Sequence, residues 1–272
     1  MKKHESIPTW IEENAMRGHY IFTKTALCSA FPTMSPTALK RAISRLIAKK
    51  TIVSPWHNFY VIVPTEYKLK GVVPPQLYLD QLMKFIECQY YVALLNAAEI
   101  FGAAHQRPQT YAVFVSKKNL RSGNKAGVDM IFYHRKKWPA NYLKKIQTPS
   151  GYMNVSSAEL TALDLVDAEK EVGGMVRVAT VLAELSENIH FSDVDSSILK
   201  IFPTPVVQRL GYLMEVALEE VEKAEDLYEL STQAGLHFRK VPLKSSKIIN
   251  KDNEVNKKWK IIVNQEIDIE EL

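Results

Sequence analysis

The sequence predicts a mixed α/β protein made of two domains, a small N-terminal one and a larger C-terminal one. Its length of 272 residues allows one large domain or two ordinary ones, and 46% apolar with 24% charged residues is typical of a globular chain. Helical and strand-like patterns follow one another along the chain, and Pro74-Pro75 after Gly71 interrupts both. We therefore predict domains at residues 1–75 and 76–272.

Three helices are expected in the first fifty residues. The first covers Trp10–Met16, and Thr23 can cap a short second helix. Ser35 followed by Pro36 predicts the start of a third helix, because the serine hydroxyl accepts an unpaired backbone N–H and proline fits the first helical position. This third helix is expected to end near Lys50. Its apolar side, which 3.6-residue spacing predicts to face the core, comprises Leu39, Ala42, Ile43, Leu46 and Ile47.

Two β-prone runs follow the third helix. Thr51–Ser54 and Phe59–Val63 are rich in β-branched and aromatic residues, and Pro55–Asn58 between them is typical of a turn. The order helix, helix, turn, helix, hairpin is that of a winged helix-turn-helix, whose last helix enters the major groove of DNA. The sequence therefore predicts a winged helix-turn-helix at the N-terminus.

The predicted third helix lies in a stretch that contains no carboxylate. Residues 14–65 hold seven lysines and arginines and no aspartate or glutamate, whereas the whole chain has a formal net charge of only +5. Cations near a duplex release condensed counterions, and here no neighbouring acid repels the phosphates. We therefore expect DNA binding by Ser35, Thr37, Lys40, Arg41, Ser44, Arg45, Lys49, Lys50, Trp56 and His57.

These residues have different expected roles. The guanidinium of Arg41 suits the edge of a guanine, while the cations at the flank and C-terminal end of the helix suit phosphates. Trp56 and His57 lie at the predicted tip of the hairpin, where they either reach DNA or pack back onto their own domain. The alternative for the whole helix is a solvated polar face.

The second domain has a mixed pattern. Residues 78–101 are mostly helical in pattern, with a break near Glu87. The other expected elements are strands at Tyr111–Val115, Val128–Tyr133 and Trp259–Val263 and helices from Ser156 or Ser157 to about Asp167, from Val176 to Asn188 and from Pro205 to about Leu230.

A second group of cations lies on and around the first two of these strands. It could extend a DNA footprint, bind RNA or an acidic partner, or form a solvated face, which is the commonest role of a charge run. This predicted second basic surface comprises Lys117, Lys118, Arg121, Lys125, Arg135, Lys136 and Lys137.

No complete catalytic motif is apparent, so an enzyme, a metal ion or a cofactor is not expected. The pair Asp193 and Asp195 is of the kind that nucleotidyltransferases use, but those enzymes also need an upstream Gly-Ser turn, and the sequence contains no Gly-Ser pair. Ser192 and Asp193 are instead expected to cap a short helix. The acid-x-lysine match of a nuclease, Glu66–Lys68, lies in the predicted linker. His105 has no neighbouring nucleophile and is interpreted as a surface or structural residue.

The cysteine content and the length of the apolar runs indicate in which cellular compartment the protein is expected. Cys28 and Cys88 are the two cysteines, which excludes a disulfide framework and favours a reducing cytoplasm. No apolar run reaches the ~18 residues that a membrane-spanning helix needs, and no secretory signal precedes the first helix. We expect a soluble cytoplasmic protein that does not enter membranes.

Several stretches of the second domain resemble the AbiEi antitoxin family. They occur in the order that the family has them, at Tyr91–Glu99, His105–Pro108, Asn154–Leu165, Arg209–Leu213 and Trp259–Asn264. The resemblance implies the transcriptional regulator of a type IV toxin-antitoxin or phage-defence operon, which represses its own operon and counters a toxin with a nucleotidyltransferase fold. One departure is Leu160, which stands where the family has an arginine, so no role of that arginine is carried over.

The combined interpretation is a sequence-specific repressor that acts as an antitoxin. Its partners would be double-stranded operator DNA and the toxin, and the sequence leaves open whether repressor and toxin touch. Two half-sites need two copies of the chain, either as a weak dimer or as monomers that assemble on inverted repeats. Two alternatives stay open: a nucleic-acid-processing enzyme of the nuclease kind that the winged helix targets, and an adaptor without catalytic activity that binds RNA or the toxin.

Overall fold

The structure is a computed structural model that describes residues 6–103 and 108–268. The chain forms two compact units, each assembled from segments that are distant in the sequence. Unit 1 contains Met1–Tyr90, Gln109–His134 and Lys145–Asn154, and unit 2 contains Tyr91–Pro108, Arg135–Lys144 and Val155–Leu272. The domain division predicted between residues 75 and 76 stays a prediction, and His105 lies outside the described residues.

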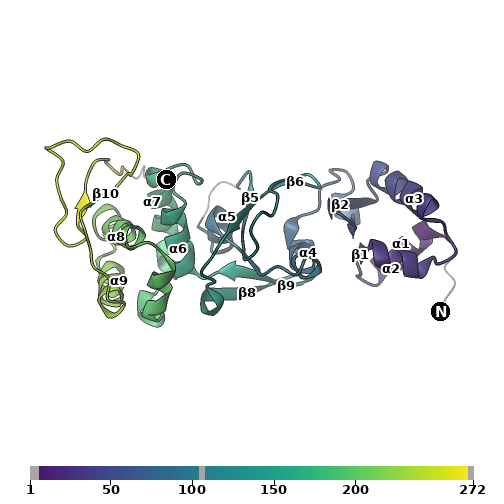
Figure 1. The fold of residues 1–272 in the computed structure, drawn as a ribbon, viewed down its shortest axis with the longest axis horizontal. Helices are drawn as coiled ribbons and strands as arrows, with labels where there is room; N and C mark the ends of the chain where they lie inside the picture. The colour runs from purple at the N-terminus through teal and green to yellow at the C-terminus, as the bar shows by residue number, and fades with distance from the viewer. Residues whose placement is uncertain (1–5, 104–107, 269–272) are drawn as a thin grey trace. The chain divides into compact units, whose positions relative to one another are not determined.

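Three helices and a small sheet open unit 1, in purple and blue in Figure 1. The starts predicted at Thr23 and Ser35 are confirmed, because each hydroxyl oxygen accepts a backbone N–H three residues on, at 3.2 Å. The first helix begins earlier than predicted, since Ser6 caps it. The elements are α1 (Ile7–Met16), β1 (Ile21–Thr23), α2 (Lys24–Ala30), α3 (Pro36–Ala48), β2 (Ile52–Trp56) and β3 (Phe59–Ile62).

The three strands form an antiparallel sheet in the order β1-β3-β2. The predicted hairpin of β2 and β3 is present, but β2 extends through Trp56, which pairs with Phe59. The turn is thus His57-Asn58 rather than four residues, and Asn58 adopts a φ of 61°, a left-handed conformation that asparagine tolerates. Strand β1 was not predicted, because three residues are too few for a recognisable alternation.

One apolar core joins these helices and strands. Leu39, Ile43 and Leu46 of α3 are buried in it, and the ring of Trp10 meets that of Phe22 edge to face at 5.3 Å. Ile47, which the helical pattern also placed inward, is 40% exposed. The other buried members of the core are Ile7, Ile11, Leu27, Phe31, Ile52, Tyr60 and Ile62.

The rest of unit 1 contains a helix and a sheet. Strand β5 pairs with β7 in parallel, and β6 pairs with β7 antiparallel. Ala126 and Gly127 connect β6 to β7, and both have positive φ, as the two central residues of a type I′ hairpin require. The elements are the short 3-10 helices at Thr65–Tyr67 and Pro75–Leu77, α4 (Leu79–Phe85), β5 (Tyr111–Val115), β6 (Gly123–Lys125) and β7 (Val128–His134).

Unit 2 is mainly helical, with α6 in contact with α5, α7 and α8. The border between the units falls within β4 (Tyr90–Val92), β8 (Leu143–Thr148) and β9 (Gly151–Ser156). In unit 2, Val92 of β4 pairs in parallel with Val155 of β9. The remaining elements are α5 (Leu94–Ile100), α6 (Ala158–Asp167), α7 (Met175–Leu185), α8 (Thr204–Tyr212), α9 (Val221–Gln233), β10 (Val241–Pro242), β11 (Ile261–Ile262) and 3-10 helices at Ala140–Tyr142, Ser186–Asn188, Phe191–Asp193 and Ser196–Ile201.

Two sequence-based expectations for these elements were wrong, and one was right in part. The helix predicted from Pro205 to Leu230 is interrupted by a π-helical turn at Leu213–Ala217 and by Glu219, whose φ is 58°. The helical pattern over residues 78–101 is present as α4 and α5 with the expected break near Glu87, but strand β4 between them was not predicted. Asp195, not Ser192 or Asp193, caps the 3-10 helix that follows, by accepting the N–H of Ser197 at 2.9 Å. Among the described helices, none has the length and hydrophobicity to cross a lipid bilayer.

Gly211 of α8 gives a direct test of packing in unit 2. A Cβ atom at this position would lie 2.2 Å from the ring of the fully buried Trp259, so the helix and the indole meet only because glycine has no side chain. We expect Gly211→Ala to lower the free energy of unfolding by about 1–3 kcal/mol, the usual cost of overpacking. Urea denaturation checks this, with the exposed Gln233→Ala as a control that changes stability little. An unchanged stability of Gly211→Ala would contradict the described packing.

Candidate nucleic-acid interface

Helix α3 separates its apolar and polar residues onto opposite sides. Its buried side faces the N-terminal core, while all of its predicted DNA-binding residues are exposed. They are Ser35, Thr37, Lys40, Arg41, Ser44, Arg45, Lys49 and Lys50. The burial of Leu39, Ile43 and Leu46 fixes which side of the helix meets solvent, because turning the helix would expose them.

The charged groups on this exposed face are not neutralised by any described residue. Within the described part of the chain, no ion pair or hydrogen bond is made by the side chains of Lys40, Arg41, Arg45 or Lys49. Lys50 differs, since its aliphatic stem packs over Gly71, where a Cβ atom would lie 2.7 Å from its Cδ. Ser44 also has an internal contact, because its hydroxyl donates to the carbonyl of Lys40 at 3.0 Å.

The two predicted residues at the tip of the hairpin differ in their surroundings. His57 is exposed, but Trp56 is half-buried and its ring meets that of Phe132 edge to face, with centroids 6.5 Å apart. The ammonium of Lys125 lies 4.6 Å from the centroid of the same indole. Trp56 is therefore packed against residues of unit 1 that lie outside the predicted domain 1–75, an arrangement that the sequence did not predict, and its contact with DNA stays a prediction.

The second basic group is divided between the two units. Lys117, Lys118, Arg121 and Lys125 belong to unit 1, where Lys125 is half-buried and the others are exposed. Lys136 and Lys137 belong to unit 2 and are exposed. The sequence-based assignment of Arg135 to this surface was wrong, because its side chain is only 8% exposed.

Arg135 instead belongs to a buried polar network of unit 2. Its guanidinium donates to Asp164, which is fully buried on α6, and also forms an ion pair with Asp167 at 3.5 Å. The hydroxyl of Tyr91 donates to the other oxygen of Asp164 at 3.1 Å. The guanidinium also lies 4.8 Å from the centroid of the Phe202 ring. This network links β4, α6 and the segment after β7, and it is structural rather than exposed to a ligand.

Burial dominates the electrostatics of this network. It raises the pKa of Asp164 to about 7, against the opposing effects of Arg135 and the Tyr91 hydroxyl. Burial also raises the pKa of Tyr91, and the Asp164 carboxylate adds to that shift. Sequence reasoning missed the network, although one signal was available: Asp164 is a single acid inside the apolar run Leu160–Val166 of an expected helix.

The described residues contain no group of three or more histidines, cysteines and acids arranged to hold a metal ion. Asp193 and Asp195 form hydrogen bonds within unit 2. The Asp195 carboxylate accepts a hydrogen bond from the Tyr142 hydroxyl at 2.8 Å, and the Asp193 carboxylate accepts one from the Ser192 hydroxyl at 3.4 Å. The chemistry that the exposed residues offer is that of cations and hydroxyls, which suits anions such as phosphate.

Comparison with known proteins bears on unit 2 and on the fold. Residues 91–216 match the model of the AbiEi antitoxin C-terminal domain, which confirms the resemblance predicted from the sequence over this part of the chain. The stretch Trp259–Asn264 lies beyond the matched residues. No curated protein matches the chain.

Several solved structures match the chain, among them the following two. The crystal structure of the RV2827C protein from Mycobacterium tuberculosis has a TM-score of 0.68 at 14% identity, over 95% of this chain and 92% of that one, which indicates a shared fold. An antigenic nucleotidyltransferase-like protein from Paracoccidioides brasiliensis has a TM-score of 0.34 at 10% identity, over 57% of this chain and 89% of that one. The second likeness is too low to support an argument.

The buried network predicts a pH dependence of stability. The pKa of Asp164 is raised from its ordinary value of 3.8 to about 7 in the folded chain. Protonation of Asp164 therefore stabilises the fold fully below pH 3.8, and this contribution is lost as the pH rises to about 7. The asparagine of Asp164→Asn carries no charge at any pH. The free energy of unfolding of the wild type, minus that of this variant, should therefore fall between pH 3.8 and about 7 and then level off. Urea denaturation across the window measures it, with the exposed Asp193→Asn as control. A difference that rises with pH would mean that Arg135 outweighs burial.

Proposed function

We propose that this chain is a sequence-specific DNA-binding repressor that acts as the antitoxin of a type IV toxin-antitoxin system. The observation that carries the proposal is the exposed face of α3, whose cationic side chains form no ion pair with a described residue. Such a face is electrostatically unsatisfied in the free protein and suits a polyanion. We propose no catalytic role for the chain.

The proposed DNA-binding module is a winged helix-turn-helix formed by residues 1–75. In its support, α1, α2 and α3 surround one core with the β1-β3-β2 sheet, and β2 and β3 form the hairpin that would be the wing. Helix α3 would be the recognition helix, with Thr37, Lys40 and Arg41 near its N-terminal half. Recognition helices usually contact base edges with residues of that half, which agrees with their placement.

The contacts of this helix with DNA would be of two kinds. Arg41, with a guanidinium free to make two parallel hydrogen bonds, would read a guanine edge. Arg45 and Lys49, towards the C-terminal end, would hold phosphates and set the register without reading sequence. Occupation of the promoter by two copies of the chain on inverted repeats would then exclude RNA polymerase and repress the operon.

The proposed antitoxin role rests on the AbiEi match. That family implies a toxin encoded beside the regulator, with a nucleotidyltransferase fold, and the matched residues 91–216 fall largely in unit 2. In this proposal the N-terminal module sets the level of expression, and the AbiEi domain counters the toxin in the cytoplasm. Direct contact between the two proteins is not needed for repression.

Substitutions on α3 test the proposal. Arg41→Ala should weaken binding to the operator by about 1–3 kcal/mol and relax the preference at one base pair, because it removes a base contact. Lys49→Ala should weaken all duplexes alike and lower the slope of log affinity against log salt by about 1, because it removes a phosphate contact. Mobility-shift titrations with the region upstream of the gene and with random duplex, at several salt concentrations, measure both effects.

The same titrations separate the proposal from its alternatives. A repressor binds its own upstream region well above random duplex at moderate salt, whereas an RNA-binding or toxin-binding adaptor has no such preference. Equal losses on operator and random DNA for Arg41→Ala would remove Arg41 from base recognition. Lys70→Ala, on an exposed residue of unit 1 outside α3 and outside both basic groups, is the matched control for loss of one positive charge.

A further inference from the structure

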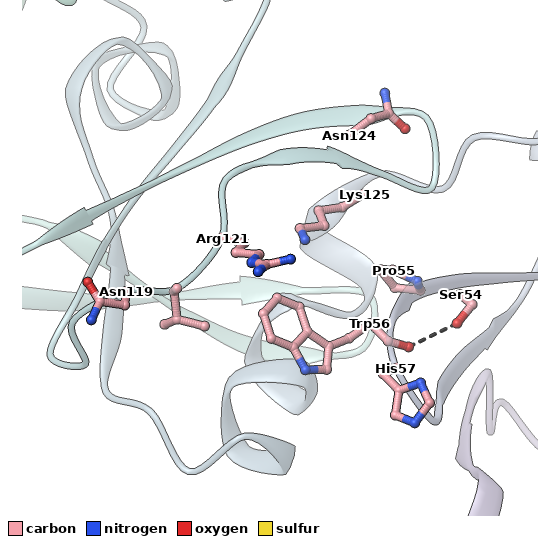
Figure 2. A pocket seen from close by; sticks show the side chains of 9 residues that line it. Ser54, Pro55, Trp56, His57, Asn119, Arg121, Asn124 and Lys125 are labelled. Carbon is pink, nitrogen blue, oxygen red and sulfur yellow. Dashed lines mark hydrogen bonds between the residues drawn. The ribbon is translucent and has the colours of Figure 1, made fainter.

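A cleft in unit 1 lies between the tip of the β2–β3 hairpin and the segment that leads into β6. Its volume is about 530 Å³, within the range of pockets that hold small molecules. The hairpin contributes Trp56 and His57, and the opposite side contributes Asn119, Arg121, Asn124 and Lys125. Figure 2 shows the Arg121 and Lys125 side chains on the same side of the Trp56 indole, with their nitrogens directed to one another.

The two cations of this cleft lack a counter-charge. No residue that lines the cleft is acidic, and neither Arg121 nor Lys125 forms an ion pair with another described residue. Burial lowers the pKa of Lys125, and the charge of Arg121 lowers it further. The carboxylate of Asp129 accepts a hydrogen bond from the amide of Asn124 at 2.9 Å and does not line the cleft. An anion between the two cations would therefore relieve a repulsion that no ion pair with a described residue offsets.

The walls of the cleft are held in place without a ligand. The Ser54 hydroxyl contacts the backbone carbonyls of Trp56 and Phe59 at 2.9 and 3.1 Å and closes the hairpin tip. On the other side, the Asn124 side chain also accepts the N–H of Gly127 at 2.8 Å, which fixes the β6–β7 turn beside Lys125. The Phe132 ring supports the indole from its edge. A site with fixed walls spends little free energy on ordering when a ligand arrives.

We propose that this cleft binds the phosphate group of a nucleotide, held by Arg121 and Lys125, with the sugar or base packed against the Trp56 indole. A guanidinium suits the geometry of phosphate oxygens, and an ammonium adds a point charge. Aromatic rings beside cationic side chains are the usual means of holding nucleotide units without reading their sequence. The phosphate could come from a free mononucleotide or from the backbone of a duplex, and the same residues would serve both. The inference goes beyond the role of α3 and does not depend on it.

NMR of the indole N–H groups tests the proposal. The chain contains four tryptophans, so a ¹H–¹⁵N spectrum shows few indole signals, and Trp56→Phe assigns the signal of Trp56 while the other signals report that the fold is intact. We expect AMP or a short random duplex to shift the Trp56 signal in a saturable way. Arg121→Ala and Lys125→Ala should each weaken the binding about 10-fold or more, since each removes a charge-assisted contact.

The control is Lys70→Ala, which removes the same charge from an exposed residue of unit 1 that does not line the cleft and belongs to neither basic group. It should change the affinity by less than about 2-fold, as expected for a charge that makes no direct contact. A shift with AMP identifies a free nucleotide as a source, and a shift with the duplex alone identifies the nucleic-acid backbone. The proposal is overturned if neither ligand moves the Trp56 signal, or if Lys70→Ala weakens binding as much as the two cleft variants.

The same experiment keeps this proposal apart from the role of α3. Both titrations are repeated with Arg41→Ala, which should leave the AMP shift unchanged, because Arg41 does not line the cleft. If α3 does not bind DNA but the cleft binds phosphate, the Trp56 signal still responds to AMP or duplex in both proteins. If the cleft does not bind phosphate but α3 binds DNA, the protein still binds the operator. Arg121→Ala and Lys125→Ala then do not change the response of the Trp56 signal to the ligand.

Discussion

The arrangement of the N-terminal part depends on the burial of one side of α3. Leu39, Ile43 and Leu46 enter a core shared with α1, α2 and the sheet, and removing such residues from water stabilises the fold by roughly 2 kcal/mol each. This burial leaves the polar side of the helix no alternative to solvent. Since no acid occurs in residues 14–65, the cations on that side have no local carboxylate to pair with. Packing and composition together thus produce an exposed cationic face.

The two units use charge in opposite ways. In unit 2, Arg135 is withdrawn from solvent and satisfied by Asp164 and Asp167, so its charge supports the fold. In unit 1, the charges of α3 and of the cleft beside Trp56 have no such partners among the described residues. A buried and paired charge is a structural device, whereas an unpaired one at the surface is available to a ligand. This contrast is the physical basis on which both proposals rest.

The sequence predicted what local chemistry determines. Thr23 and Ser35 were identified as helix starts because a hydroxyl cap needs only its own next three residues, and both cap helices in the structure. For the helix that ends at Asp167 the sequence left Ser156 and Ser157 open, and Ser157 is the cap. The match of residues 91–216 to the AbiEi domain was likewise visible in ordered motifs. The exposure of the α3 cations followed from helical periodicity, although the same periodicity wrongly placed Ile47 inside.

The sequence did not predict the features that depend on contacts between residues distant in the chain. Strands β1 and β4 have three residues each and exist through pairing with β3 and β9, which no local pattern reveals. Arg135 looked like part of a basic run because Asp164, its partner, is 29 residues away. The position of Trp56 against Phe132 and Lys125 required the hairpin and β6 to be brought together in space. The candidate site on α3 was therefore predictable, and the cleft was not.

The most direct test of the account is photocrosslinking from α3 to DNA. A photoreactive side chain at the exposed Thr37 should crosslink to a duplex that carries the region upstream of the gene, and one at the exposed Gln233 of α9 should not. Crosslinking from Thr37 that competes with unlabelled operator but not with random duplex is the result that the account predicts. Retention of the operator without crosslinking from Thr37 would contradict it, because DNA would then be bound by another face of the molecule.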